Sequence, residues 1–238
     1  ARGQEVYLNN KGGKLNWPEG VGCREKDNLR LAQIGPKWQS CTTFGTSFGY
    51  LEAEDAEDYP HKKKSVREVI HEMIEVISRN GNFLINIGPR ADGTIPEWQV
   101  ERLRAMGDWL KINGAAIYGS RYWHTTGQAN AHLAFTTNGK KLYAICLQQP
   151  QPFTIEATKG WTAADVESVR LLGSEGKVEW AIDDNGLRIT PPSDFGASKH
   201  AWAFEILTTK NQHTPADLGN ALQEKRQTVI HSEDSTDY

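Results

Sequence analysis

Three carboxylates stand close together near the start of the chain: Glu19, Glu25 and Asp27. The segment that holds them, residues 16–28, has neither helical nor strand periodicity, and it follows a run at residues 5–9 that predicts a strand. Long loops after strands are where α/β enzymes place catalytic acids. The carboxylates are therefore candidates for acid–base chemistry. The alternative reading of the segment is a solvated surface loop whose charges have no chemical role.

A helix is expected over residues 65–80. Ser65 and Glu68 have the spacing of a capping box, and Asn80-Gly81 is a typical helix end. His71 falls within this helix, and we expect it to be a surface or hydrogen-bonded histidine rather than a catalytic one. Apolar residues recur at steps of three and four and form one face: Val66, Val69, Ile70, Met73, Ile74 and Ile77.

The next elements are a short strand and a second helix. Residues 83–87 are apolar, too short for a helix and bounded by turn residues, which predicts a buried strand. Pro96 opens a helical pattern that closes at Asn113-Gly114. Before these elements, residues 38–44 predict another strand, and the charged segment 52–64 predicts a solvated loop. Helix, apolar strand, polar loop and helix make one turn of an α/β barrel or doubly wound sheet.

From residue 132 the pattern changes to short β-rich runs, which predict an antiparallel β-sandwich. Asn138-Gly139 and residues 183–186 are the clearest turn signals between them. We place the domain border near residues 122–130. Beyond residue 209 the chain is polar, with one weak helical candidate over residues 215–227. The runs are 132–136, 141–147, 166–172, 177–182, 186–190 and 201–206.

The composition excludes several classes of protein. Of the 238 residues, 38% are apolar and 24% charged, which allows a packed core; the net charge of −3 and the absence of a basic, aromatic-rich segment give no support for nucleic-acid binding. No apolar run approaches the roughly 20 residues that cross a bilayer. Three scattered cysteines are too few for a disulfide scaffold.

Several motifs in fixed order, spanning about residues 5–123, resemble the α-L-fucosidases of glycoside hydrolase family 29. One departure is Ala115, where the family usually has glutamate; we expect a packing or surface position there. The motifs are Trp38, Ser47-Phe48-Gly49-Tyr50, the run from Ile77 to Pro89, Asp92-Gly93-Thr94-Ile95-Pro96, Gly107-Asp108-Trp109-Leu110, Asn113-Gly114 and Ile117-Tyr118-Gly119.

The resemblance implies a fold of two classes, α/β plus all-β. Residues 1–123 would be the last strands and helices of a partial (βα)8 TIM-like barrel, residues 124–209 an antiparallel β-sandwich and residues 210–238 a polar C-terminal tail. A complete barrel needs eight strands and about 250 residues, so most of it would lie upstream of Ala1. A partial barrel also exposes a sheet edge, so we expect the chain alone to be oligomeric or held by further contacts.

The resemblance also implies a retaining glycosidase, which uses two carboxyl groups roughly 5–5.5 Å apart. The aspartate nucleophile would lie upstream of this chain, which alone is expected to be inactive. Glu25 best fits the acid/base by its spacing to Trp38; Glu19 is second and Asp27 third. Arg24 and Lys26 would lower the pKa of Glu25, so the charge of the missing nucleophile is needed to keep it protonated.

Three further positions carry over as substrate contacts. Lys11 stands where the family often has an arginine. Lysine keeps the positive charge but lacks the planar guanidinium, so its contact with the sugar would be a single, less directional hydrogen bond. Phe48 matches an aromatic that lines the pocket for the methyl group of the sugar, and Trp38 belongs to the same matched region. An apolar wall favours a 6-deoxy sugar because it leaves the hydroxyl of other sugars without a hydrogen-bond partner.

The partners implied are fucosylated oligosaccharides or glycoconjugates, without a cofactor or metal ion. Secretion or a periplasmic location is expected from the family. Two other hypotheses remain: a non-catalytic carbohydrate-binding or structural unit, because the nucleophile is absent, and a small independent α/β protein that shares only ancestry.

Overall fold

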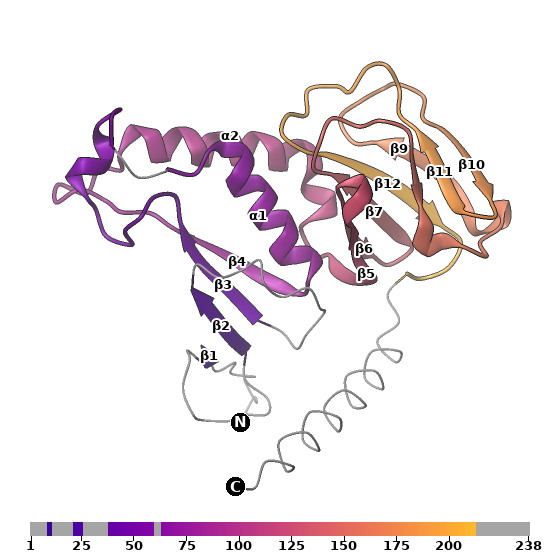
Figure 1. Ribbon diagram of the computed structural model, residues 1–238, viewed down its shortest axis with the longest axis horizontal. Coiled ribbons are helices and arrows are strands. Elements are labelled where there is room, and N and C mark those ends of the chain that lie inside the picture. Colours follow the sequence, from indigo (N-terminus) through magenta and orange to yellow (C-terminus); the bar gives the residue numbers. More distant parts are fainter. Residues whose placement is uncertain (1–8, 11–20, 26–37, 60–62, 213–238) are drawn as a thin grey trace, which may run out of the picture.

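A computed structural model describes residues 9–10, 21–25, 38–59 and 63–212 of the chain (Figure 1). Its first part is a parallel sheet with two α-helices, and its second part is a pair of antiparallel sheets. Within these residues, no helix has the length and apolar character to cross a membrane. The predicted tail helix at 215–227 lies outside the described residues.

The first sheet has the strand order β1-β2-β3-β4, and each neighbouring pair is parallel. Because the strands are parallel, their carboxyl ends meet at one edge, which holds Glu25, Thr43 and Asn86. The strands predicted over residues 38–44 and 83–87 are both present. The bounds are β1 (Asn9–Asn10), β2 (Val21–Glu25), β3 (Trp38–Thr43) and β4 (Gly81–Asn86).

Strand β2 corrects the sequence prediction that residues 16–28 are a loop. Its five residues contain one glycine and two charged side chains, so they carry little intrinsic strand preference. What makes them a strand is pairing: Val21 and Gly22 lie against β1, and residues 22–25 lie against β3. Such non-local pairing leaves no periodicity in a short segment.

Helix α1 (Val66–Ser78) begins as predicted with a capping box. The amide of Glu68 donates to Ser65 Oγ at 3.2 Å, and the amide of Ser65 donates to Glu68 Oε2 at 2.8 Å. Helix α2 (Glu97–Asn113) begins directly after Pro96, also as predicted. Ala115, just beyond α2, is exposed, in agreement with a surface position.

The predicted antiparallel sandwich is present as a five-stranded sheet, β5-β6-β7-β12-β9, and a three-stranded sheet, β10-β11-β8. Two strands were missed: β5, which crosses the predicted domain border, and the three-residue β8. The bounds are β5 (Arg121–Gln128), β6 (Leu133–Asn138), β7 (Lys141–Cys146), β8 (Phe153–Ile155), β9 (Val166–Leu171), β10 (Glu179–Asp183), β11 (Gly186–Thr190) and β12 (Trp202–Thr208).

Two apolar cores hold these layers together. One lies between the two sandwich sheets, around the buried Trp123, Phe135 and Phe204. The other is shared between the two parts of the chain: Ile70 and Ile74 of α1 and Trp109 of α2 pack in one cluster with residues of β6, β7 and β12. Figure 1 shows α1 lying between the parallel sheet and the five-stranded sheet.

The opposite face of the parallel sheet has no such cover among the described residues. Phe83 and Ile85 of β4 pack against the helical core, whereas Leu84 between them is 42% exposed. In the described part of the chain, β1–β4 form an open sheet that is accompanied by two α-helices. The partial barrel therefore stays a prediction, and the domain boundaries stay one as well.

Asn113, at the end of α2, ties this helix to the sandwich. It is fully buried, its Nδ2 donates to Ser198 Oγ at 2.9 Å, and its Oδ1 accepts from the amide of Ala203 at 3.3 Å. We expect Asn113→Ala to lower the free energy of unfolding by about 1–3 kcal/mol, because both partners are left buried. Urea unfolding would measure this, with the exposed Asn82→Ala as the control. An equal, small effect of both substitutions would contradict it.

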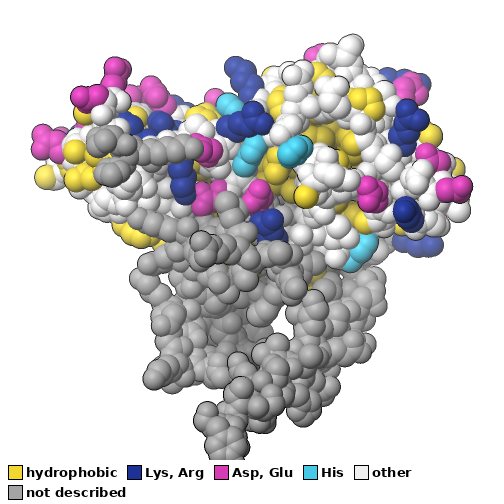
Figure 2. Space-filling model, in the orientation of Figure 1, with side chains coloured by type: hydrophobic (Ala, Val, Ile, Leu, Met, Phe, Trp, Pro, Cys, Tyr) yellow, Lys and Arg dark blue, Asp and Glu magenta, His cyan; other side chains and the backbone are white. Residues whose placement is uncertain are grey.

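A histidine contact crosses the same boundary. His71 Nε2 lies 2.8 Å from the carbonyl oxygen of His200, whose φ of 73° is in the left-handed region. The sequence predicted a surface or hydrogen-bonded histidine rather than a catalytic one, and the structure shows His71 hydrogen-bonded. Figure 2 shows histidine and Lys or Arg side chains gathered where the helical part meets the sandwich. Burial lowers the pKa of His71 below 6.5, although the hydrogen bond to the carbonyl opposes this shift, and the charge of Arg67 adds to it.

The pH dependence of stability follows from this pKa. A base whose pKa is lowered by folding binds fewer protons in the folded state, so stability is full above the unfolded pKa of about 6.5 and falls as pH drops below it. We expect urea unfolding to show this loss between pH 7.5 and 5.5, and His71→Gln, which can still donate to the carbonyl, to reduce it. His200 has a pKa lowered by burial too, so part of the loss should remain. A wild-type stability that rises toward acid pH would contradict the prediction.

Candidate active site

The carboxyl edge of the parallel sheet carries the residue predicted as acid/base. Glu25 is the last residue of β2, where the sequence predicted a loop, and its main chain pairs with Cys41 of β3. Cys41 pairs in turn with Leu84 of β4. Glu25 therefore lies at the sheet edge where α/β enzymes bind substrates. Lys11, Glu19 and Asp27 lie outside the described residues.

Phe48 belongs to the segment after β3 and lies beside the carboxyl ends of β3 and β4. Thr43 and Asn86 are register partners at the ends of β3 and β4. Thr43 Oγ1 donates to the carbonyl of Ser47 at 3.0 Å, and Asn86 Nδ2 donates to the carbonyl of Phe48. Side chains from two strands thus fix two consecutive peptide groups. Phe48, which is half-buried, is held next to the strand ends.

Glu54 corrects the prediction that residues 52–64 are a solvated loop. Glu54 is 2% exposed and belongs to the short 3-10 helix η1 (Glu52–Asp55). Its Oε1 accepts from the amide of Thr46 at 2.6 Å and from Thr46 Oγ1 at 2.7 Å. A Cβ at Gly45 would lie 2.4 Å from this carboxylate, so any larger residue there would displace the Glu54 side chain. By accepting these two hydrogen bonds, Glu54 holds the helix η1 against the residues that directly follow β3. An acidic residue in a charged segment of the sequence gives no sign of this buried role.

Asp55 joins the same segment to the loop that follows β4. Its carboxylate accepts from Arg90 Nη2 at 2.7 Å, from Trp98 Nε1 at 3.1 Å and from the Tyr50 hydroxyl at 3.0 Å. The Arg90 guanidinium also lies 5.6 Å from the centre of the Tyr50 ring. Burial would raise the pKa of the Asp55 carboxyl, but the three hydrogen bonds outweigh it and hold that pKa below 3.8.

Trp38 lies away from Phe48. It is the first residue of β3, so it is at the amino edge of the parallel sheet. The indole is 5% exposed, donates to the carbonyl of Arg79 at 2.9 Å and packs so closely on Gly81 that a Cβ there would come within 2.7 Å. In this position Trp38 joins β3 to the end of α1. Its predicted substrate contact stays a prediction and would require the sugar to reach this edge.

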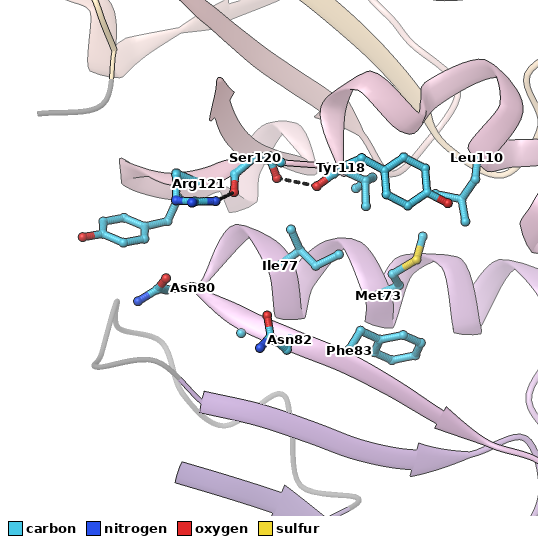
Figure 3. A pocket seen from close by; sticks show the side chains of 13 residues that line it. Met73, Ile77, Asn80, Asn82, Phe83, Leu110, Tyr118, Ser120 and Arg121 are labelled. Carbon is cyan, nitrogen blue, oxygen red and sulfur yellow. Dashed lines mark hydrogen bonds between the residues drawn. The ribbon is translucent and has the colours of Figure 1, made fainter. Parts of the chain in front are cut away.

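A cavity of about 430 Å³ opens near the amino end of β4 (Figure 3). Met73 and Ile77 of α1, Phe83 of β4 and Tyr118 line its apolar part, and Asn82 and Arg121 are among its polar groups. Although its size would suit a sugar, the cavity lies at the end of β4 opposite Asn86, and Phe48 is not among the described residues that line it. The carboxyl edge is therefore the better candidate for the chemistry.

The family follows from comparison with known proteins. A family model described as "Alpha-L-fucosidase" matches residues 2–115, and one described as "Alpha-L-fucosidase C-terminal domain" matches residues 126–207. The chain belongs to the α-L-fucosidase family. The resemblance seen in the sequence motifs is thus confirmed, and the second match coincides with the β-sandwich.

Individual fucosidases show the same relationship. Human tissue α-L-fucosidase is 34% identical over 181 residues, covering 73% of this chain and 38% of that protein. The α-L-fucosidase of Dictyostelium discoideum is 38% identical over 115 residues, or 48% of this chain and 24% of that protein. The structure of Thermotoga maritima α-fucosidase with a mechanism-based inhibitor aligns with a TM-score of 0.68 and 26% identity, over 84% of this chain and 45% of that one. The chain thus spans less than half the length of these relatives.

The hydrogen bonds around Asp55 lead to a titration prediction. Because these hydrogen bonds favour the ionised form, carbon NMR should place the midpoint of the Asp55 carboxyl titration below pH 3.8. Arg90→Gln should raise this midpoint, because it removes the hydrogen bond that lowers the pKa most. The stability that Asp55 contributes is present above its unfolded pKa and is lost as pH falls through the folded value. A midpoint that does not respond to Arg90→Gln would contradict the assignment.

Proposed function

We propose that this chain carries the acid/base side of a retaining exo-α-L-fucosidase that removes terminal α-L-fucosyl residues from oligosaccharides or glycoconjugates. The observation that carries the proposal is the position of Glu25 at the carboxyl edge of the parallel sheet, beside the strands whose ends hold Phe48, in a member of this family. A secreted or periplasmic location suits such substrates.

In this proposal Glu25 first protonates the oxygen of the departing glycan and then, as carboxylate, removes a proton from water. Between these steps an aspartate attacks the anomeric carbon and forms a covalent fucosyl-enzyme, which the water hydrolyses with net retention. The aspartate belongs to polypeptide upstream of residue 1. Lys11 donates a hydrogen bond to the sugar, and Phe48 faces its methyl group.

The same proposal makes β1–β4 the last strands of a (βα)8 barrel. Two observations support it: all pairs in the sheet are parallel, and among the described residues the outer edge of β4 has no partner strand. Leu84 of β4, at 42% exposure, adds apolar surface on the uncovered face of this sheet. The missing strands would cover the open face and bring the nucleophile to the carboxyl edge.

A matched pair of substitutions tests the acid/base assignment. In the complete polypeptide encoded by the reading frame, Glu25→Gln should lower kcat for an aryl α-L-fucoside by about 10²–10⁴-fold, the usual contribution of a general acid–base group. Azide, which needs no base to attack the fucosyl-enzyme, should restore turnover and give the α-configured fucosyl azide. Glu19→Gln is the control and should leave kcat close to wild type.

Other results would favour other readings. If Glu19→Gln loses activity and Glu25→Gln does not, the acid/base is Glu19. If the complete wild-type polypeptide binds fucose without hydrolysing aryl fucosides, the alternative of a non-catalytic carbohydrate-binding unit holds. Turnover by the 238-residue chain alone would overturn the placement of the nucleophile upstream.

A further inference from the structure

The main chain around Phe48 is fixed by residues outside its own segment. Two of these contacts are the hydrogen bonds from Thr43 to the Ser47 carbonyl and from Asn86 to the Phe48 carbonyl. Since Thr43 and Asn86 are paired at the ends of neighbouring strands, the position of Phe48 follows the register between β3 and β4.

A close main-chain contact supports Phe48 from the loop after β4. A Cβ added to Gly88 would lie 2.8 Å from the amide nitrogen of Tyr50 and 2.9 Å from the carbonyl of Gly49. These are backbone atoms, so the clash could not be relieved by a side-chain rotation. Gly88 is itself held from α2, because its amide donates to Gln99 Oε1 at 3.1 Å and Gln99 is 4% exposed.

The far end of the Phe48 segment is attached to the same loop. Asp55 accepts hydrogen bonds from Arg90 and Trp98, and the Arg90 guanidinium lies over the Tyr50 ring. The segment from Ser47 to Asp55 is therefore supported along its length by residues 86–98. This is the kind of packed and hydrogen-bonded support that keeps a binding residue in one geometry.

We propose that Asn86 and Gly88 are positioning residues that set the sugar selectivity of the site by fixing Phe48. This rests on the proposed function, in which Phe48 faces the methyl group of the substrate. An α-L-galactoside differs from an α-L-fucoside only in having a hydroxyl on that carbon. A fixed phenyl ring leaves the extra hydroxyl desolvated and unpaired, whereas a displaced ring lets water or a polar group reach it.

The first experiment uses the 238-residue chain and needs no activity. Hydrogen–deuterium exchange of peptides covering residues 45–51 should become about tenfold faster in Asn86→Ala, which loses one hydrogen bond, and in Gly88→Ala, whose added Cβ pushes the two backbones apart. Asn82→Ala, an exposed asparagine at the other end of the same strand, is the matched control and should leave this exchange unchanged. Peptides from α1 should not respond in any variant.

The second experiment uses the complete polypeptide and two aryl glycosides. The ratio of kcat/KM for the α-L-fucoside to that for the α-L-galactoside should fall about tenfold in Asn86→Ala and Gly88→Ala, and stay at the wild-type value in Asn82→Ala. A general loss of folded protein lowers both rates and leaves their ratio intact. If either variant fails to fold, Thr43→Val removes only the hydroxyl that holds the Ser47 carbonyl and should lower the ratio in the same direction.

The outcomes separate this inference from the proposed function. If wild type hydrolyses the fucoside but neither exchange nor the selectivity ratio responds to Asn86→Ala and Gly88→Ala, the positioning role is wrong and the fucosidase proposal stands. If exchange responds but the ratio does not, the support is structural and the selectivity role is wrong. If wild type hydrolyses neither glycoside, the proposed function fails, and the inference about selectivity fails with it.

Discussion

Burial of helix α1 between two different sheets, with α2 packed against it, is the constraint on which this structure depends. The apolar residues of both helices share one core with Phe83 and Ile85 of the parallel sheet and with residues of β6, β7 and β12 of the sandwich. Trp109 adds a directional contact, because its buried indole donates to the carbonyl of Ala201 at 2.9 Å. The sandwich is thus part of the support for the parallel sheet whose carboxyl edge carries the candidate site.

At that edge the geometry comes from side chains that are distant in sequence from the residue they fix. Asn86 and Phe48 are 38 residues apart, and Arg90 and Asp55 are 35 apart. Glu54 supplies the local fold by binding Thr46 from a buried position. Because each contact uses a hydrogen bond or a backbone approach rather than broad apolar burial, the segment is defined by a few specific residues.

Elements with a local signal could be predicted from the sequence, and elements that depend on distant partners could not. The capping box and apolar face of α1, the proline at the start of α2 and the turn at Asn138-Gly139 each act within a few residues. Strand β2 exists through its pairing with β1 and β3, so its residues read as a loop. The burial of Glu54 was missed for the same reason, since its partners are set by the path of the chain after β3. Motif order revealed the family, whereas the roles of Glu25 and Phe48 still rest on that resemblance.

The shared core has a consequence for how such chains can diverge. Asn113 and Trp109 bond to main-chain groups of residues 201–203, so the helices require a particular backbone path from the sandwich as well as apolar side chains. A chimera that grafts the sandwich of another family member onto this sheet would lose these bonds unless that path were matched. The two parts should therefore be inherited together, and drift in one should be followed by compensating changes in the other.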